Sequence, residues 1–114
     1  MPCFLIFSKA NQFANQVAQI IPIGIGASNT AIQALNKAIP AWATSKNTTE
    51  SPIWVVDQYT GFTTTELRDG VHPSEAGDQK MTKVWYPAIV NAIKIVQAEK
   101  GAALAAKREI EFAA

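Results

Sequence analysis

The apolar positions of the chain predict a strand–helix–strand unit followed by a long helix. Residues 17–23 form a short, nearly continuous apolar run rich in β-branched side chains, as expected of a strand buried in a parallel sheet. Residues 53–57 form a second run of the same kind. Parallel neighbours need a long crossover connection, so we expect the two strands to pair in parallel with a helix between them.

The segment between the two runs carries apolar residues at helical spacing. The stripe consists of Ile32, Leu35, Ile39 and Trp42. Ser28 or Asn29 is the expected cap of this helix, because their side-chain oxygens accept hydrogen bonds from the first turn. Pro40 lies within the stripe and predicts a kink or a new turn there. Residues 44–52 are polar and predict a surface loop.

A second helical pattern begins near residue 74. Pro73 suits its first turn, where the missing N–H costs nothing, and Pro87 is expected to break or bend the helix. Residues 98–114 form a charged, alanine-rich tail without a strong apolar stripe. Residues 1–16 fit either a strand or a helix, and the helical spacing of their apolar residues favours a helix.

The composition excludes several classes of function but does not identify one. The 114 residues allow one domain, and 48% apolar with 17% charged residues is globular. A net charge of +1 with scattered basic residues gives no reason to expect nucleic acid or an anionic membrane surface. One cysteine and one histidine exclude an internal disulfide and a tetrahedral zinc site, so we expect no metal or cofactor. The sequence shows no membrane span and no signal peptide, which leaves the localisation open.

The only histidine, His72, is the candidate for acid–base chemistry, because imidazole titrates near neutral pH. Asp69 precedes it by three residues and can reach the Nδ1–H, which leaves Nε2 free to accept a proton from a hydroxyl. The loop that carries both residues follows the second strand, at the edge of a parallel sheet where ligands bind. The alternative is that both are polar loop residues near a helix start. Gly24 and Gly26 suggest a nucleotide-binding half-fold only weakly, since the third glycine and the acidic residue of that motif are absent.

The sequence 69–73 (Asp-Gly-Val-His-Pro), followed by Gly77, resembles the C-terminal block of SGNH, or GDSL-like, hydrolases. Three further stretches, residues 18–22, 31–40 and 56–62, resemble the preceding elements of microbial polysaccharide deacetylases, above all acetyl xylan esterases of carbohydrate esterase family three. The resemblance covers roughly residues 5–97. It implies a partial SGNH-hydrolase (flavodoxin-like) three-layer α/β fold, with a short parallel sheet and flanking helices. Residues 1–97 are then a truncated SGNH-like domain, and residues 98–114 a tail.

The resemblance implies that His72 is the general base and that Asp69 orients it. It also implies a deacetylase of O-acetylated polysaccharide such as xylan, whose relatives are often secreted. The nucleophile of the family lies in a Gly-Asp-Ser block that this chain begins too late to contain, so we expect little activity from the chain alone. The other hydroxyl and thiol candidates read better as caps, surface residues or buried side chains: Ser8, Ser28, Ser45, Ser51, Ser74 and Cys3. The alternative function is a non-catalytic remnant or small interaction module. An exposed sheet edge predicts self-association.

Overall fold

The computed structural model describes residues 14–113, and all statements below concern that range. Strand β1 (Asn15–Gln19) leads into helix α2 (Gly26–Lys46), which returns the chain to strand β2 (Ile53–Asp57). A short 3-10 helix, η1 (Thr64–Glu66), precedes the long helix α3 (Glu75–Ala113). The predicted strand–helix–strand unit is therefore confirmed.

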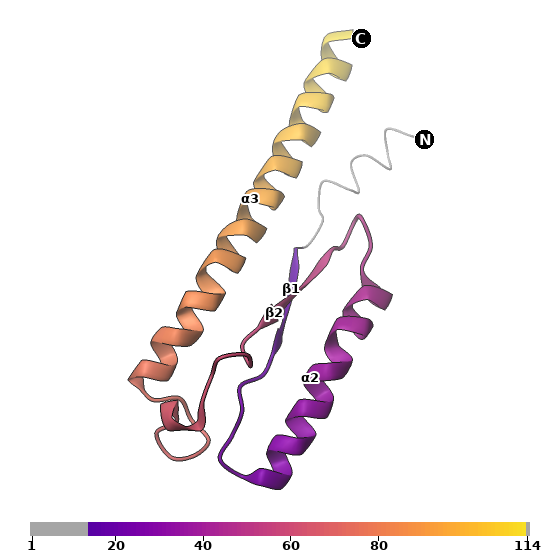
Figure 1. Ribbon diagram of the computed structural model, residues 1–114. Coiled ribbons are helices and arrows are strands. Elements are labelled where there is room, and N and C mark those ends of the chain that lie inside the picture. Colours follow the sequence, from indigo (N-terminus) through magenta and orange to yellow (C-terminus); the bar gives the residue numbers. More distant parts are fainter. Residues whose placement is uncertain (1–13, 114) are drawn as a thin grey trace.

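The two strands form a parallel sheet that lies between the two helices (Figure 1). Their register pairs Asn15 with Ile53 and Gln19 with Asp57, so both strands end at the same level. Both helices contact β2, and α2 also contacts β1. The result is a three-layer α/β arrangement in which the loops after β1 and β2 emerge side by side at one edge.

The boundaries of several elements differ from those that the sequence predicted. Strand β2 matches, but β1 ends at Gln19, because the apolar residues that follow lie in the connection to α2. Helix α2 begins at Gly26 with no side-chain cap, so neither Ser28 nor Asn29 caps it. It runs to Lys46, into the predicted loop. The helix favoured for residues 1–16 lies almost wholly outside the described residues, and its last two residues belong to β1.

Helix α2 buries a different stripe from the predicted one. Its buried residues are Asn36, Ile39 and Ala43, whereas Leu35 and Trp42 are half exposed. The apolar spacing identified the helix. The buried positions 36 and 43 each lie one residue after the predicted positions 35 and 42, and only Ile39 is common to both sets. A polar residue, Asn36, occupies the centre of the buried face because it has a specific hydrogen-bonding role.

Asn36 extends the hydrogen bonding of the sheet beyond the end of β1. Its amide oxygen accepts a hydrogen bond from the N–H of Ile20 at 2.8 Å, and its amide nitrogen donates to the carbonyl of Ile20 at 2.8 Å. Pro40, four residues on, has no N–H for the Asn36 carbonyl, and the side chain of Gln19 donates to that carbonyl instead at 2.8 Å. Helix α2 is therefore continuous through Pro40, and no new turn begins there.

Replacing Asn36 with alanine is expected to lower the free energy of unfolding by about 2 kcal/mol, because two hydrogen bonds of a buried side chain disappear. Asn29→Ala in the same helix is the matched control. It makes the same gain in helix propensity, and the Asn29 amide oxygen has no hydrogen-bond partner to lose. Urea unfolding of both variants checks the expectation. Equal destabilisation by the two substitutions would contradict this role of Asn36.

Helix α3 is one continuous element of 39 residues. It begins at Glu75, two residues after Pro73, so the predicted place of Pro73 in its first turn is wrong. It also continues through Pro87, where the sequence predicted a break or bend. The charged tail is its C-terminal part, and no helix boundary separates it from the preceding residues. The 65 Å long dimension of the molecule follows from the length of this helix.

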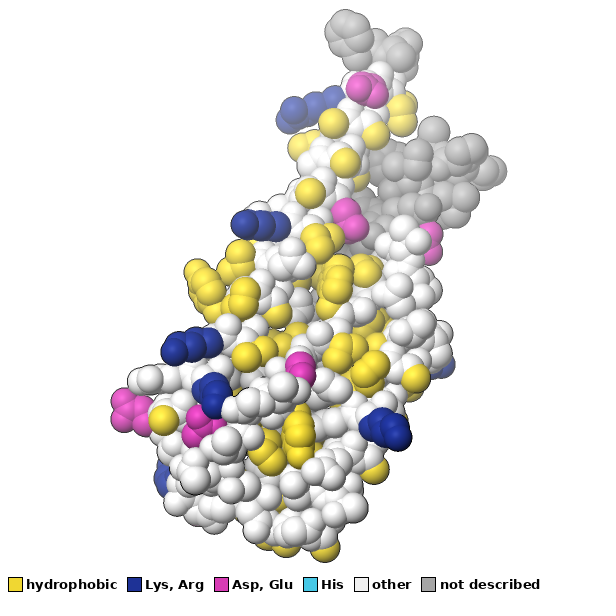
Figure 2. All heavy atoms as spheres, in the orientation of Figure 1, with side chains coloured by type: hydrophobic (Ala, Val, Ile, Leu, Met, Phe, Trp, Pro, Cys, Tyr) yellow, Lys and Arg dark blue, Asp and Glu magenta, His cyan; other side chains and the backbone are white. Residues whose placement is uncertain are grey.

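The apolar core of the described chain is thin. The buried apolar side chains of the described residues are few: Pro22, Ile39, Ala43, Val56 and Phe62. Large apolar side chains of both helices and of the sheet remain exposed, and Figure 2 shows such side chains along α3 and across the centre of the face. Among the described residues, neither helix is long and apolar enough to cross a membrane.

Candidate active site

The candidate site lies on a narrow loop, residues 66–74, between η1 and α3. Leu67 and Pro73 form an antiparallel bridge at its base. The N–H of Arg68 donates to the carbonyl of His72 at 2.7 Å, and the N–H of Ser74 donates to the carbonyl of Glu66 at 2.8 Å. The loop is thus a short hairpin, with Asp69 and His72 on either side of its tip.

Asp69 and His72 are in direct contact. The Nδ1 atom of His72 lies 2.6 Å from Oδ2 of Asp69. The other carboxylate oxygen of Asp69 accepts the backbone N–H groups of Val71 at 3.0 Å and His72 at 2.7 Å. Asp69 therefore fixes both the turn and the imidazole ring. The structure brings together the two residues that the sequence singled out, and their catalytic roles stay a prediction.

The carboxylate of Asp69 is stabilised in its charged form. The backbone N–H of His72, the imidazole of His72 and the backbone N–H of Val71 hold the pKa of Asp69 well below its usual range. Oδ2 of Asp69 thus remains an acceptor throughout the neutral and mildly acidic range. This oxygen favours the tautomer of the imidazole that carries its proton on Nδ1, and Nε2 has no hydrogen-bond partner within the described part of the chain.

Lowering the pH is expected to remove the stability that Asp69 contributes. Its pKa is depressed on folding, so the contribution is complete above the usual value of 3.8 and is lost as the pH falls below it. Asp69→Asn should therefore be less stable than the parent at neutral pH, and the difference should shrink toward pH 3. Urea unfolding of both proteins across this range measures it. A difference that stays constant with pH would show that the charge of Asp69 adds nothing.

A second carboxylate braces the base of the loop. Glu66 accepts the N–H of Thr63 at 2.8 Å through one oxygen and contacts Nζ of Lys80 at 2.8 Å through the other. The hydrogen bond from Lys80, then that from Thr63, lowers the pKa of Glu66. Lys80 also donates to the carbonyl of Gly61, so it ties α3 to the end of η1 and to the turn before it. The spacing of Thr63 and Glu66 is that of a capping box, which sequence reading did not use.

Two glycines join this loop to the one that follows β1. The N–H of Gly24 donates to the carbonyl of Gly70 at 2.7 Å. A Cβ atom on Gly24 would lie 3.3 Å from that carbonyl oxygen, so the close approach favours glycine. Gly70 has φ of 83°, which is in the left-handed region that glycine adopts at little cost. Gly24 therefore supports the Asp–His loop.

The hydroxyl candidates that the structure describes are engaged elsewhere or lie in helices. The Ser74 hydroxyl donates to the carbonyl of Glu66 and accepts the N–H of Gly77, so it caps α3. Ser45 donates to a carbonyl of its own helix, and Ser51 accepts from Asn15. Ser28 lies in the first turn of α2. Ser8 and Cys3 lie outside the described residues. Among residues 14–113, no group of three or more potential metal ligands is present.

The described fold is a parallel sheet between helices, with an Asp–His pair on the chain segment beyond the end of the second strand. Two solved structures match this chain. One is an acetyl esterase, a serine-to-alanine mutant with acetate ion, with 40% identity over 73% of this chain and a TM-score of 0.68. The other is a carbohydrate esterase family 3 protein from Talaromyces cellulolyticus, with 39% identity over 71% of this chain and a TM-score of 0.66.

The match confirms the partial flavodoxin-like α/β fold and the resemblance to SGNH esterases of carbohydrate esterase family 3. The chain thus resembles hydrolases that act on ester bonds. It spans 41% and 40% of the length of these two structures. Comparisons with protein-family models and with curated proteins found no match.

Proposed function

We propose that this chain carries the acid–base half of an SGNH-type esterase that removes acetyl groups from an O-acetylated polysaccharide such as xylan. The single observation that supports this most is the 2.6 Å contact between Nδ1 of His72 and Oδ2 of Asp69, on a loop beyond the carboxyl end of β2. The identity of 39–40% to a carbohydrate esterase and an acetyl esterase supports the substrate class.

In the proposed reaction His72 acts as general base and then as general acid. With Nδ1–H held by Asp69, Nε2 accepts the proton of a serine hydroxyl as the serine oxygen bonds to the acetyl carbonyl carbon. The proton passes to the sugar oxygen as the ester bond breaks, which leaves an acetylated serine. Water then attacks the acetyl carbon, Nε2 takes its proton and returns it to the serine oxygen, and acetate leaves.

The serine and the oxyanion donors are proposed to come from chain outside these 114 residues, which contain no Gly-Asp-Ser sequence. Loss of the nucleophile of a triad lowers kcat about 10⁶-fold in one studied protease. Each missing oxyanion donor costs about a further 10²–10³. We therefore expect the chain alone to show little turnover of esters.

A chimeric esterase tests the proposal. In the carbohydrate esterase from Talaromyces cellulolyticus, the segment that this chain matches is replaced by the chain itself. Release of acetate from acetylated xylan and from 4-nitrophenyl acetate is then measured. A folded chimera that hydrolyses both supports the proposed function. A folded chimera without activity would contradict it, and its circular dichroism and gel-filtration profile distinguish this outcome from misfolding.

The rival proposal is a non-catalytic remnant or small interaction module, favoured by the thin core of the described chain. Assaying the chain alone with 4-nitrophenyl acetate separates the two. Turnover that His72→Ala abolishes would rule out the non-catalytic proposal. An inactive chain combined with an inactive chimera would favour it.

The unpaired strand edges and exposed apolar side chains lead us to expect self-association. Ile89 and Ile93 are about half exposed, lie one turn apart on α3 and present a contiguous apolar surface to solvent. Sedimentation velocity over a range of protein concentrations should show species larger than the monomer. Ile93→Glu should shift the distribution toward the monomer, because it places a charge in that surface. A monomer at every concentration would contradict this expectation.

A further inference from the structure

A hollow of about 260 Å³, lined by polar residue types, lies over the carboxyl ends of both strands, on the side of α2. The last residues of the two strands, Gln19 and Asp57, form part of its wall. The rest of the wall comes from one face of α2 and from the turn after β2: Gln33, Asn36, Lys37, Tyr59 and Thr60. The Asp69–His72 pair is not among the lining residues.

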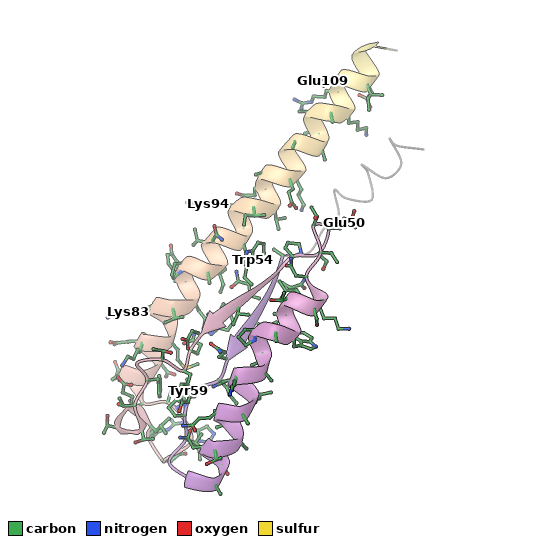
Figure 3. The ribbon with its side chains drawn as sticks, turned by 45° about the vertical axis from the view of Figure 1, so that its right-hand side comes forward. Glu50, Trp54, Tyr59, Lys83, Lys94 and Glu109 are labelled. Carbon is green, nitrogen blue, oxygen red and sulfur yellow. The ribbon has the colours of Figure 1, made fainter. Side chains whose placement is uncertain are left out.

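Hydrogen bonds between residues of the wall fix the shape of the hollow. The Gln33 amide donates to the Tyr59 hydroxyl at 2.8 Å, across the gap between α2 and the turn. Figure 3 shows Tyr59 near the lower end of the strands, on the side of α2. Oδ1 of Asp57 accepts the backbone N–H groups of Tyr59 and Thr60, both at 2.9 Å, which fixes the turn. These contacts fix Gln33, Tyr59 and the carboxylate of Asp57 before any ligand arrives.

Several hydrogen-bonding groups on the wall keep a donor or acceptor that no neighbour uses, and these are available to a small ligand. The Tyr59 hydroxyl accepts from Gln33 and so keeps its own proton to donate. The Gln33 amide uses its NH₂ group on Tyr59, which leaves its carbonyl oxygen to accept. Lys37 has no carboxylate partner among the described residues. Hydrogen bonds from Thr60 and Tyr59 lower the pKa of Asp57, so the hollow holds one carboxylate and one ammonium.

We propose that this hollow binds one uncharged sugar ring of a polysaccharide through adjacent hydroxyl groups. A hydroxyl both donates and accepts, so neighbouring hydroxyls can donate to Asp57 while accepting from Lys37 and Tyr59. An anionic ligand that paired with Lys37 would face the carboxylate of Asp57, and a cationic one would face Lys37. One charge of each sign on the wall therefore favours a neutral, hydroxyl-rich ligand. The volume is below that of sites for drug-sized molecules, which suits a single ring.

The inference extends the proposed esterase function, because a sugar bound here would be anchored at the same sheet edge as the Asp–His loop. The N–H of Gly24 joins the loops after β1 and β2 through Gly70, so both sites rest on one framework. Sugar binding in the hollow depends on its own donors, acceptors and charges, and it does not require catalysis. Sugar binding and ester hydrolysis are therefore tested separately.

Titrating the ¹⁵N-labelled chain with xylotriose, followed by ¹H–¹⁵N NMR, tests the proposal. The side-chain amides of Gln19, Gln33 and Asn36 report on the hollow directly. We expect their signals to shift at millimolar sugar. Lys37→Met and Tyr59→Phe should each weaken binding about tenfold, the effect of losing one hydrogen bond worth about 1.4 kcal/mol. Lys46→Met is the matched control, because Lys46 lies in the last turn of the same helix and not in the hollow.

His72→Ala should leave sugar binding unchanged, which separates a failure of the hollow from a failure of the catalytic proposal. The proposal is overturned if the amide signals do not move at millimolar xylotriose, or if Lys37→Met and Tyr59→Phe bind as well as the control. Binding of tri-galacturonate in place of xylotriose would also overturn it, because it would show that the hollow selects an anion.

Discussion

Replacing His72 with alanine in the chimeric esterase is expected to lower kcat about 10⁴-fold or more, with little change in KM. The imidazole is proposed to carry the proton in both halves of the reaction, and no other described side chain has an acid–base group on this loop tip except Asp69. Asp69→Asn should cost about 10⁴-fold, because the ring would lose the partner that fixes its tautomer. Initial rates with 4-nitrophenyl acetate measure both effects.

The matched control is Glu75→Gln, which changes an exposed carboxylate in the first turn of α3, close in sequence to His72. Its kcat should stay within about twofold of the parent chimera. A chimera that retains a tenth or more of its activity after His72→Ala would contradict the assignment of the general base. Equal losses in all three variants would point to a general loss of structure.

Replacing Gly77 with alanine is expected to lower the free energy of unfolding by about 2–3 kcal/mol. Gly77 is buried at the start of α3, and a Cβ atom there would lie 2.5 Å from the carbonyl oxygen of Glu66. The same methyl group would meet the side chains of Phe62 and Pro73, both at 3.1 Å. That carbonyl also accepts two hydrogen bonds from Ser74, so it cannot move away without disturbing the Asp–His loop.

Gly101→Ala provides the control within the same helix. No atom lies within 4 Å of a Cβ atom at that position, so only the gain in helix propensity remains, about 1 kcal/mol of stabilisation. Thermal unfolding of both variants should therefore shift the midpoint in opposite directions. If Gly77→Ala also stabilised the chain, the tight contact between α3 and the loop would not exist in solution.

The strand–helix–strand order was predictable because each element has a strong local signal. The apolar run of β2 has polar or proline residues on both sides, which fixes its ends. Strand β1 was misplaced because its apolar signal continues past Gln19 into residues that leave the sheet. Asn36 could not be recognised as a buried residue, because its side chain pairs with the backbone of Ile20, which lies outside the helix that carries Asn36.

The Asp–His contact was predictable from the motif, whereas the contacts that other parts of the chain make with this loop were not. A separation of three residues on one loop is short enough for direct contact, and Gly70 permits the turn. Lys80 and Gly24 reach the loop from other elements, and no local pattern indicates such contacts. Helix α2 continues through Pro40, where the side chain of Gln19 supplies the missing donor to the Asn36 carbonyl, and α3 does not break at Pro87.

The measurement that tests the account most directly is the tautomer of His72 by ¹⁵N NMR. His72 is the only histidine, so its ring nitrogens need no assignment among competitors. At mildly alkaline pH the neutral ring should carry its proton on Nδ1, donated to Asp69, with Nε2 unprotonated and available as a base. Asp69→Asn should abolish this preference. A parent protein whose His72 carries the proton mainly on Nε2 would contradict a preformed acid–base pair.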